Sequence, residues 1–121
     1  MVENNMGGTF INMNTEKFPE VVLSKDEKIE YLNSIISRAH KTLHLIEEEC
    51  RTGYSPTPYI AGLMFELNAA DSLYGNKFVT IIVKLEGIRK QYKEMDFKDV
   101  KKQIFEIRRI VNRMIKEISE G

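Results

Sequence analysis

The chain has 121 residues, of which 42% are hydrophobic and 30% charged, and its formal net charge is zero. This length and composition fit one globular domain whose core needs no metal or disulfide to hold it. The neutral balance excludes a protein that attracts polyanions or membrane surfaces through its overall charge. The single cysteine, Cys50, excludes an internal disulfide and fits a reducing compartment.

Targeting signals are absent from the sequence pattern. No apolar run approaches the roughly 20 residues that span a bilayer, and the first residues lack the basic and apolar regions of a secretory signal. We therefore expect a cytoplasmic protein. The abundance of Ile, Lys, Glu and Asn is typical of AT-rich bacterial genomes.

Residues 1–23 carry no helical periodicity. Their Asn-rich and Gly-containing stretches indicate flexibility, yet Phe10, Phe18 and Leu23 are too apolar for a plain solvated tail. We expect an extended, partly flexible arm over residues 1–23 that lies across a helical domain formed by residues 24–121.

The first helix is expected over residues 25–52. Ser24 and Glu27 match a capping box, and Gly53 supplies a left-handed stop. Apolar residues follow at alternating spacings of three and four, which predicts one buried stripe: Ile29, Leu32, Ile36, Ala39, Leu43, Ile46 and Cys50. On this stripe Cys50 is expected to be a small buried hydrophobe.

Two shorter helices follow, over residues 58–74 and 77–95. Thr57 is the expected N-cap of the earlier one, with Pro58 at its first position, and Gly75 ends it. Residues 78–83 are rich in β-branched side chains and would also suit a buried strand. The spacing of three and four continues through Met95, which favours a helix.

The last helix is expected over residues 97–119, with Asp96 as its N-cap. Four helices with one apolar stripe each, joined by short connections, predict an all-α, antiparallel four-helix bundle. The charge is split along the chain. Residues 1–75 hold 6 basic and 11 acidic residues (6 − 11 = −5), and residues 76–121 hold 12 and 7 (12 − 7 = +5).

The two middle helices carry apolar residues that their core stripes do not explain. These residues are Ala61, Phe65 and Ala69 on one helix and Val79 and Val83 on the next. A helix that is apolar on a second face needs another cover. The N-terminal arm, a second copy of the chain and a different protein are the three possible covers.

A weak metal candidate lies on the first helix, where His40 and His44 stand four residues apart with Glu47 and Glu48 one turn later. Two histidines on one helical face can share a metal ion. Both lie off the core stripe, and the pattern lacks the paired Glu-x-x-His signature, so solvated histidines are the better interpretation. No cofactor is expected.

A basic ridge follows the last helix. Its members are Lys101, Lys102, Phe105, Arg108, Arg109, Arg113 and Lys116. Cations interleaved with an aromatic could hold phosphates and stack a base. The alternative is a solvated surface neutralised by the acidic end of the first helix, around Glu47, Glu48 and Glu49.

These features predict a non-enzymatic interaction or regulatory module. We expect it to form a homodimer, or to bind a protein partner, through the apolar faces of its middle helices. Nucleic-acid binding through the basic ridge is the first alternative. The length and expected architecture also resemble those of bacterial immunity proteins against peptide bacteriocins, which are small cytosolic four-helix bundles. That resemblance implies an immunity or antitoxin role by fold analogy alone.

Overall fold

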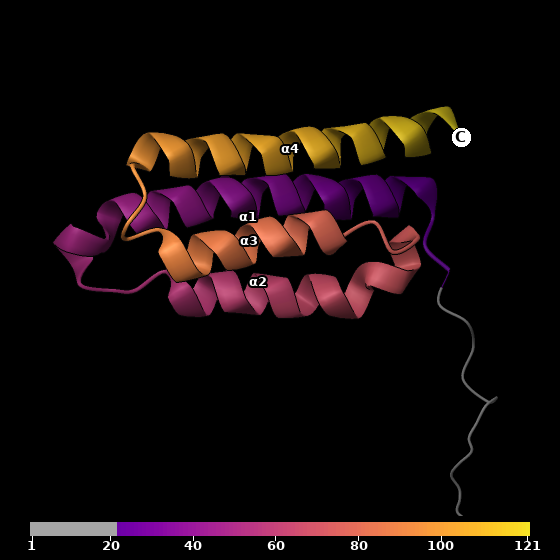
Figure 1. Cartoon of the computed structure of the whole chain (residues 1–121). Coiled ribbons are helices and arrows are strands. Elements are labelled where there is room, and N and C mark those ends of the chain that lie inside the picture. The colour runs from indigo at the N-terminus through magenta and orange to yellow at the C-terminus, as the bar shows by residue number, and fades with distance from the viewer. Residues whose placement is uncertain (1–21) are drawn as a thin grey trace, which may run out of the picture.

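The computed structural model describes residues 22–121, and the predicted arm therefore lies outside the described residues except for its last two positions. Within that range the chain forms four α-helices: α1 (Lys25–Thr52), α2 (Thr57–Ala70), α3 (Val79–Gln91) and α4 (Phe97–Glu120). A short 3-10 helix, η1 (Asp71–Tyr74), extends α2. Successive helices run in opposite directions, and the predicted all-α antiparallel bundle is confirmed (Figure 1).

Helix packing closes the bundle around one core. α1 packs most extensively on α4 and α2 on α3, while α3 also touches α4 and α1 touches α2 least. The largest fully buried side chain is Phe78, at the start of α3. It lies against Tyr74 with ring centroids 5.0 Å apart, and Tyr74 stacks on Tyr31 of α1 at 5.7 Å.

The start and end of α1 follow from its local sequence. Ser24 accepts a hydrogen bond from the backbone N–H of Glu27, whose carboxylate accepts one from the N–H of Ser24, so the capping box is complete. Gly53 adopts a left-handed φ of 76° and its N–H bonds the carbonyl of Glu49.

The predicted stripe of α1 is partly wrong. Its fully buried residues are Leu32, Ile35, Ala39 and Thr42, whereas Cys50 is exposed. Because α1 contacts both α4 and α2, its buried arc is wider than one heptad stripe, and several stripe residues such as Ile36 are only partly buried. The hydroxyl of Thr42 is tolerated there because it donates to the carbonyl of Arg38 at 3.0 Å.

The ends of the middle helices also differ from prediction. α2 begins one residue earlier, with Pro56 at its N-cap position, and its last turn tightens into η1 before Gly75 turns left-handed at φ 68°. α3 begins at Val79, where the carboxylate of Asp71 accepts the N–H of Phe78 at 2.9 Å. It stops four residues short of the expected end, because 3-10-type bonds reverse the chain before α4.

Residues 78–83, the stretch with strand character, enter α3 and form no strand. Asp96 occupies the N-cap position of α4 in an extended conformation, but its side chain makes no capping hydrogen bond. None of the helices among the described residues combines the length and apolar character needed to cross a membrane.

Candidate functional site

The second apolar face predicted for the middle helices lies on the surface of the molecule. Phe65 falls two residues after buried Leu63 and two before buried Leu67, and two residues turn an α-helix by about 200°. Phe65 therefore points away from the core and is 80% exposed. The same spacing around Ile81 and Leu85 turns Val79 and Val83 outward.

We call this surface the α2–α3 face. Its members are Ala61, Phe65, Ala69, Val79 and Val83, all of them exposed. Val83 and Val79 are 64% and 57% exposed, so the largest side chains of the face all lie open to solvent. Exposed apolar side chains gathered on one surface are typical of sites that contact another molecule.

A shallow groove runs along the α2–α3 face between the two helices. Its walls combine apolar and polar residues: Ala61, Met64, Phe65, Asn68, Ile82, Glu86 and Arg89. Met64 and Ile82 are partly buried and connect the face to the core. Sequence reasoning missed Ile82, because its position, a quarter turn from the stripe of α3, looks like neither core nor surface.

The charged rim of this groove is neutralised within α3. Arg89 makes two hydrogen bonds to Glu86, at 2.6 and 2.9 Å, and Lys90 approaches the same carboxylate at 3.5 Å. The hydrogen bonds from Arg89 lower the pKa of Glu86 below its usual value. The Arg89–Glu86 pair therefore carries no net charge, and Lys90 is the remaining cation of the rim.

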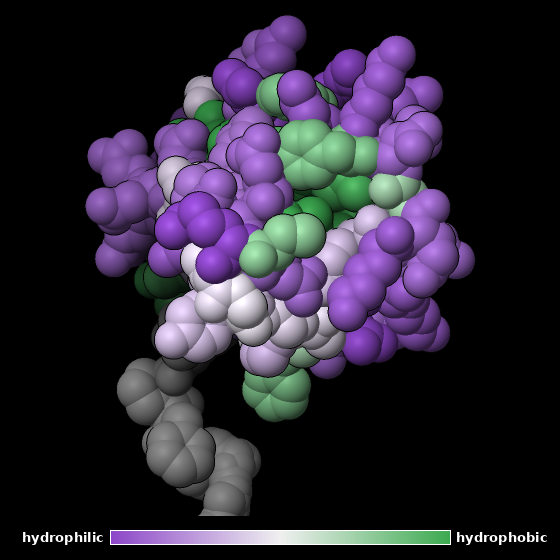
Figure 2. Space-filling model, turned by 90° about the vertical axis from the view of Figure 1, so that its left-hand side faces the viewer, coloured by the Kyte–Doolittle hydropathy of each residue, from purple (hydrophilic) through white to green (hydrophobic). Residues whose placement is uncertain are grey.

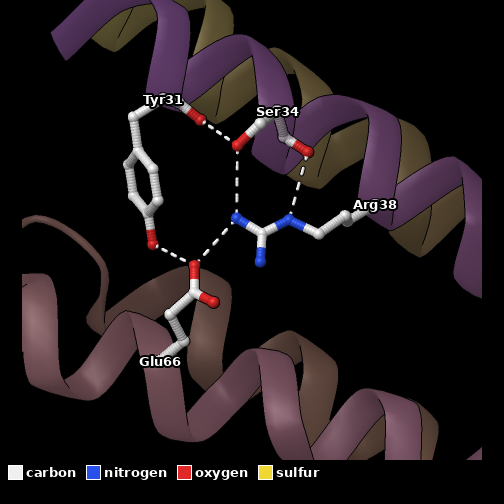
Figure 3. Close-up of polar contacts among 4 residues, drawn as sticks. All are labelled: Tyr31, Ser34, Arg38 and Glu66. Carbon is white, nitrogen blue, oxygen red and sulfur yellow. Dashed lines mark hydrogen bonds and ion pairs between the residues drawn. The ribbon is translucent and has the colours of Figure 1, made fainter. Parts of the chain in front are cut away.

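A polar cluster holds α2 against α1 on the opposite side of α2 (Figure 3). Tyr31 donates to a Glu66 carboxylate oxygen at 2.5 Å, and Arg38 pairs with the same oxygen at 2.8 Å. Ser34 accepts from Arg38 at 3.2 Å and donates to the carbonyl of Tyr31 at 2.6 Å. These four residues form the Tyr31–Glu66 cluster.

Ionisation of the Tyr31–Glu66 cluster follows from this geometry. Hydrogen bonds from Arg38 and Tyr31 lower the pKa of Glu66. Burial, reinforced by the Glu66 carboxylate, raises the pKa of Tyr31 to about 12. Because Glu66 is the only charged residue of α2, its engagement by α1 leaves the outer side of α2 without charge.

A hollow lies at the end of the bundle where α1 and α3 end and α4 begins. Figure 2 shows its hydrophobic floor surrounded by hydrophilic side chains. The hollow has a volume of about 500 Å³, and its lining is mostly apolar: Ile46, Glu49, Cys50, Tyr92, Lys93, Met95, Phe97 and Val100. Cys50 is exposed in this hollow because the last turn of α1 extends beyond the core. The prediction that Cys50 is buried is therefore wrong.

The two predicted metal candidates separate in the structure. His40 packs edge-on against Phe105 of α4, with ring centroids 5.5 Å apart. His44 instead joins Glu47 and Glu48, and one ligand atom from each lies within 4.8 Å of the others. Three such ligands could hold a cation, but Arg51 already binds the carboxylate of Glu48.

The basic ridge of α4 is exposed as predicted from its periodicity. Its six cations are all exposed, and none of them forms an ion pair with another described residue. Two acidic residues of α4 pair with residues outside it: Glu106 with Lys84 of α3 at 2.7 Å, and Glu117 with Lys77, in the connection before α3, at 3.1 Å. The expected pairing with the acidic end of α1 is not observed among the described residues, since Glu49 accepts from Tyr92.

The chain matches no protein-family model, and no curated protein or solved structure is significantly similar to it. The chemistry of these surfaces is therefore the basis for a functional proposal.

Proposed function

We propose that this protein is a non-enzymatic helical-bundle interaction module that binds a protein partner through the α2–α3 face. One observation supports this most strongly: Phe65, a large aromatic residue, stands 80% exposed in the middle of an uncharged helix surface. Aromatic anchors surrounded by apolar neighbours are typical of the buried centres of protein interfaces.

The energetics favour a covered face. A Phe side chain that becomes fully buried gains roughly 1.5–3 kcal/mol relative to exposure. In the isolated chain Phe65 is exposed and loses most of this gain. An aromatic residue at that position therefore adds little to the stability of α2. A partner that covers Phe65 would recover the gain and would give the residue a role.

The single cysteine and the composition support a cytoplasmic setting in a bacterium, and we include both in the proposal. The proposed activity is binding, so no residue is assigned a catalytic role.

The test is photo-crosslinking in cells that produce the protein. Phe65 is replaced by p-benzoylphenylalanine, and the matched control carries the same replacement at Tyr54, an equally exposed aromatic in the α1–α2 connection. We expect one discrete protein adduct from position 65 and none from position 54. Equal labelling at both positions would refute the proposal, and so would the absence of an adduct from position 65 both in cells and in purified protein at about 1 mM.

A second candidate function is nucleic-acid binding by the basic ridge of α4. The observation that favours it is that the six exposed cations of the ridge form no ion pair with another described residue, while Glu106 and Glu117 pair with Lys84 and Lys77. It predicts fluorescence anisotropy changes with a labelled oligonucleotide that fall steeply with salt. Arg108→Glu/Arg109→Glu should abolish them, while the charge-matched Lys41→Glu/Lys90→Glu should not.

A further inference from the structure

We infer that the partner on the α2–α3 face is a second copy of this chain, with its α2 antiparallel to the first and crossing it at Phe65. This assignment rests on the proposed function, because it names the partner of the same surface. It is carried by three features of α2: the symmetry of its outer residues, an unexplained glycine and the absence of charge on its outer side.

The outer residues of α2 are arranged symmetrically about Phe65. Ala61 and Ala69 lie four residues before and after it, on the adjacent turns of the helix. In a two-fold symmetric interface the same patch serves both copies, and residue i contacts residue j as j contacts i. Antiparallel α2 helices would place the two Phe65 rings side by side, with Ala61 of each copy level with Ala69 of the other.

Gly62 supplies the second feature. Glycine inside a helix costs about 1 kcal/mol relative to alanine. The isolated chain offers no steric reason for it, because a Cβ added at Gly62 would meet nothing within 4 Å. A second helix crossing one turn from Gly62 does offer a reason, since small residues let two helix backbones approach closely and make room for the aromatic ring of the other copy.

Charge is the third feature. A surface that meets its own copy must avoid like charges opposite each other. The one charged residue of α2, Glu66, is held on the far side by Tyr31 and Arg38, and Glu86 beside the groove is neutralised by Arg89. The outer side of α2 is therefore compatible with a second copy of itself.

The size of the face sets the concentration at which pairing should be visible. Helices of 14 and 13 residues are each about 20 Å long and lie about 9 Å apart, so two of them present roughly 350–400 Å². The total for two copies, roughly 700–800 Å², is below the about 1,200 Å² of a standard interface. We expect a low-affinity dimer, and concentrations up to about 1 mM are needed to populate it.

Cysteine pairing tests the orientation, with Cys50→Ser removing the native thiol. Positions 61 and 69 are eight residues apart, about 12 Å along the helix, which is beyond the reach of a disulfide within one chain or between identical positions of antiparallel copies. The antiparallel arrangement therefore predicts covalent dimers from Ala61→Cys/Ala69→Cys, or from a mixture of the two single variants. Neither single variant alone should form them.

Gly62→Gln should weaken dimerisation at least tenfold in sedimentation velocity without unfolding the chain, because the isolated helix has open space there. The control is Asn112→Gln, at an exposed position of α4, a helix that takes no part in the α2–α3 face. The control should dimerise like the native chain.

Each failure has a distinct meaning. If the native chain stays monomeric at about 1 mM while position 65 crosslinks a different protein in cells, the partner is not a second copy. The proposed function then still holds. Crosslinking by either single cysteine variant alone overturns the antiparallel arrangement. A dimer that survives Phe65→Asp unchanged overturns the inference, and the proposed face then depends on the crosslinking from position 65.

Discussion

The Tyr31–Glu66 cluster gives the sharpest prediction about stability, because it is the main polar connection between α1 and α2. Glu66→Gln keeps the shape and nearly the helix propensity of the residue, but it removes the charge that Arg38 and Tyr31 share. The Glu66 side chain is 46% exposed, so its ion pair belongs near the surface range of about 0.2–1 kcal/mol. Because the hydrogen bond from the Tyr31 hydroxyl is also weakened, we expect the unfolding free energy to fall by about 1 kcal/mol.

The dependence on pH separates this charge effect from a simple packing defect. The folded pKa of Glu66 lies below its usual 4.5, so its stabilisation is present above pH 4.5 and is lost as pH falls through the lowered value. The difference in unfolding free energy between the native chain and Glu66→Gln should therefore become smaller as pH falls from 7 to 3. Urea unfolding followed by circular dichroism at each pH measures it.

A matched control is Glu117→Gln, which removes an ion pair whose two side chains are both more than half exposed. It should change the unfolding free energy by only about 0.3 kcal/mol or less. The reasoning is refuted if Glu66→Gln is as mild as this control at pH 7, or if its deficit is undiminished at pH 3.

Three further predictions concern other parts of the fold. Phe78→Ala empties the largest fully buried position and should cost about 3–5 kcal/mol in urea unfolding, against less than 1 kcal/mol for Tyr54→Ala, whose residue is 78% exposed. Ser24→Ala breaks the capping box of α1 and should cost about 1 kcal/mol, visible as a lower Tm. Tyr31, with its pKa raised to about 12, keeps its proton in the folded chain at pH values where the unfolded chain, near 10, has lost it. Its contribution is thus complete below pH 10 and lost as pH rises toward 12, so native chain and Tyr31→Phe should converge in stability over that window.

Much of the fold could be predicted from local sequence, because its signals are local. The capping box at Ser24, the glycine at position 53 and the spacing of three and four each act within one or two turns. The outward position of Phe65 follows from the same periodicity. Helix type was decided correctly for residues 78–83 because periodicity outweighed β propensity.

The parts that sequence reasoning missed depend on contacts between helices. Thr42 is buried although it is polar, because its hydroxyl donates a hydrogen bond to a carbonyl of its own helix. Cys50 is exposed because the last turn of α1 extends beyond the core. The convergence of Tyr31 and Arg38 on Glu66 joins residues up to 35 positions apart, and no local pattern announces it. The hollow beside Cys50 likewise exists only where three helix ends meet.

The pairing of the first helix with the last also has a consequence for the folding route. The α2–α3 contact closes a connection of 8 residues (79 − 70 − 1), whereas the α1–α4 contact spans 44 (97 − 52 − 1). Loop-closure entropy makes the longer closure costlier by about 1.5 kcal/mol. The hairpin that carries Phe65 should therefore form early, with α1 and α4 joining afterwards. Substitutions inside the hairpin should slow refolding, while substitutions at the α1–α4 seam should mainly accelerate unfolding.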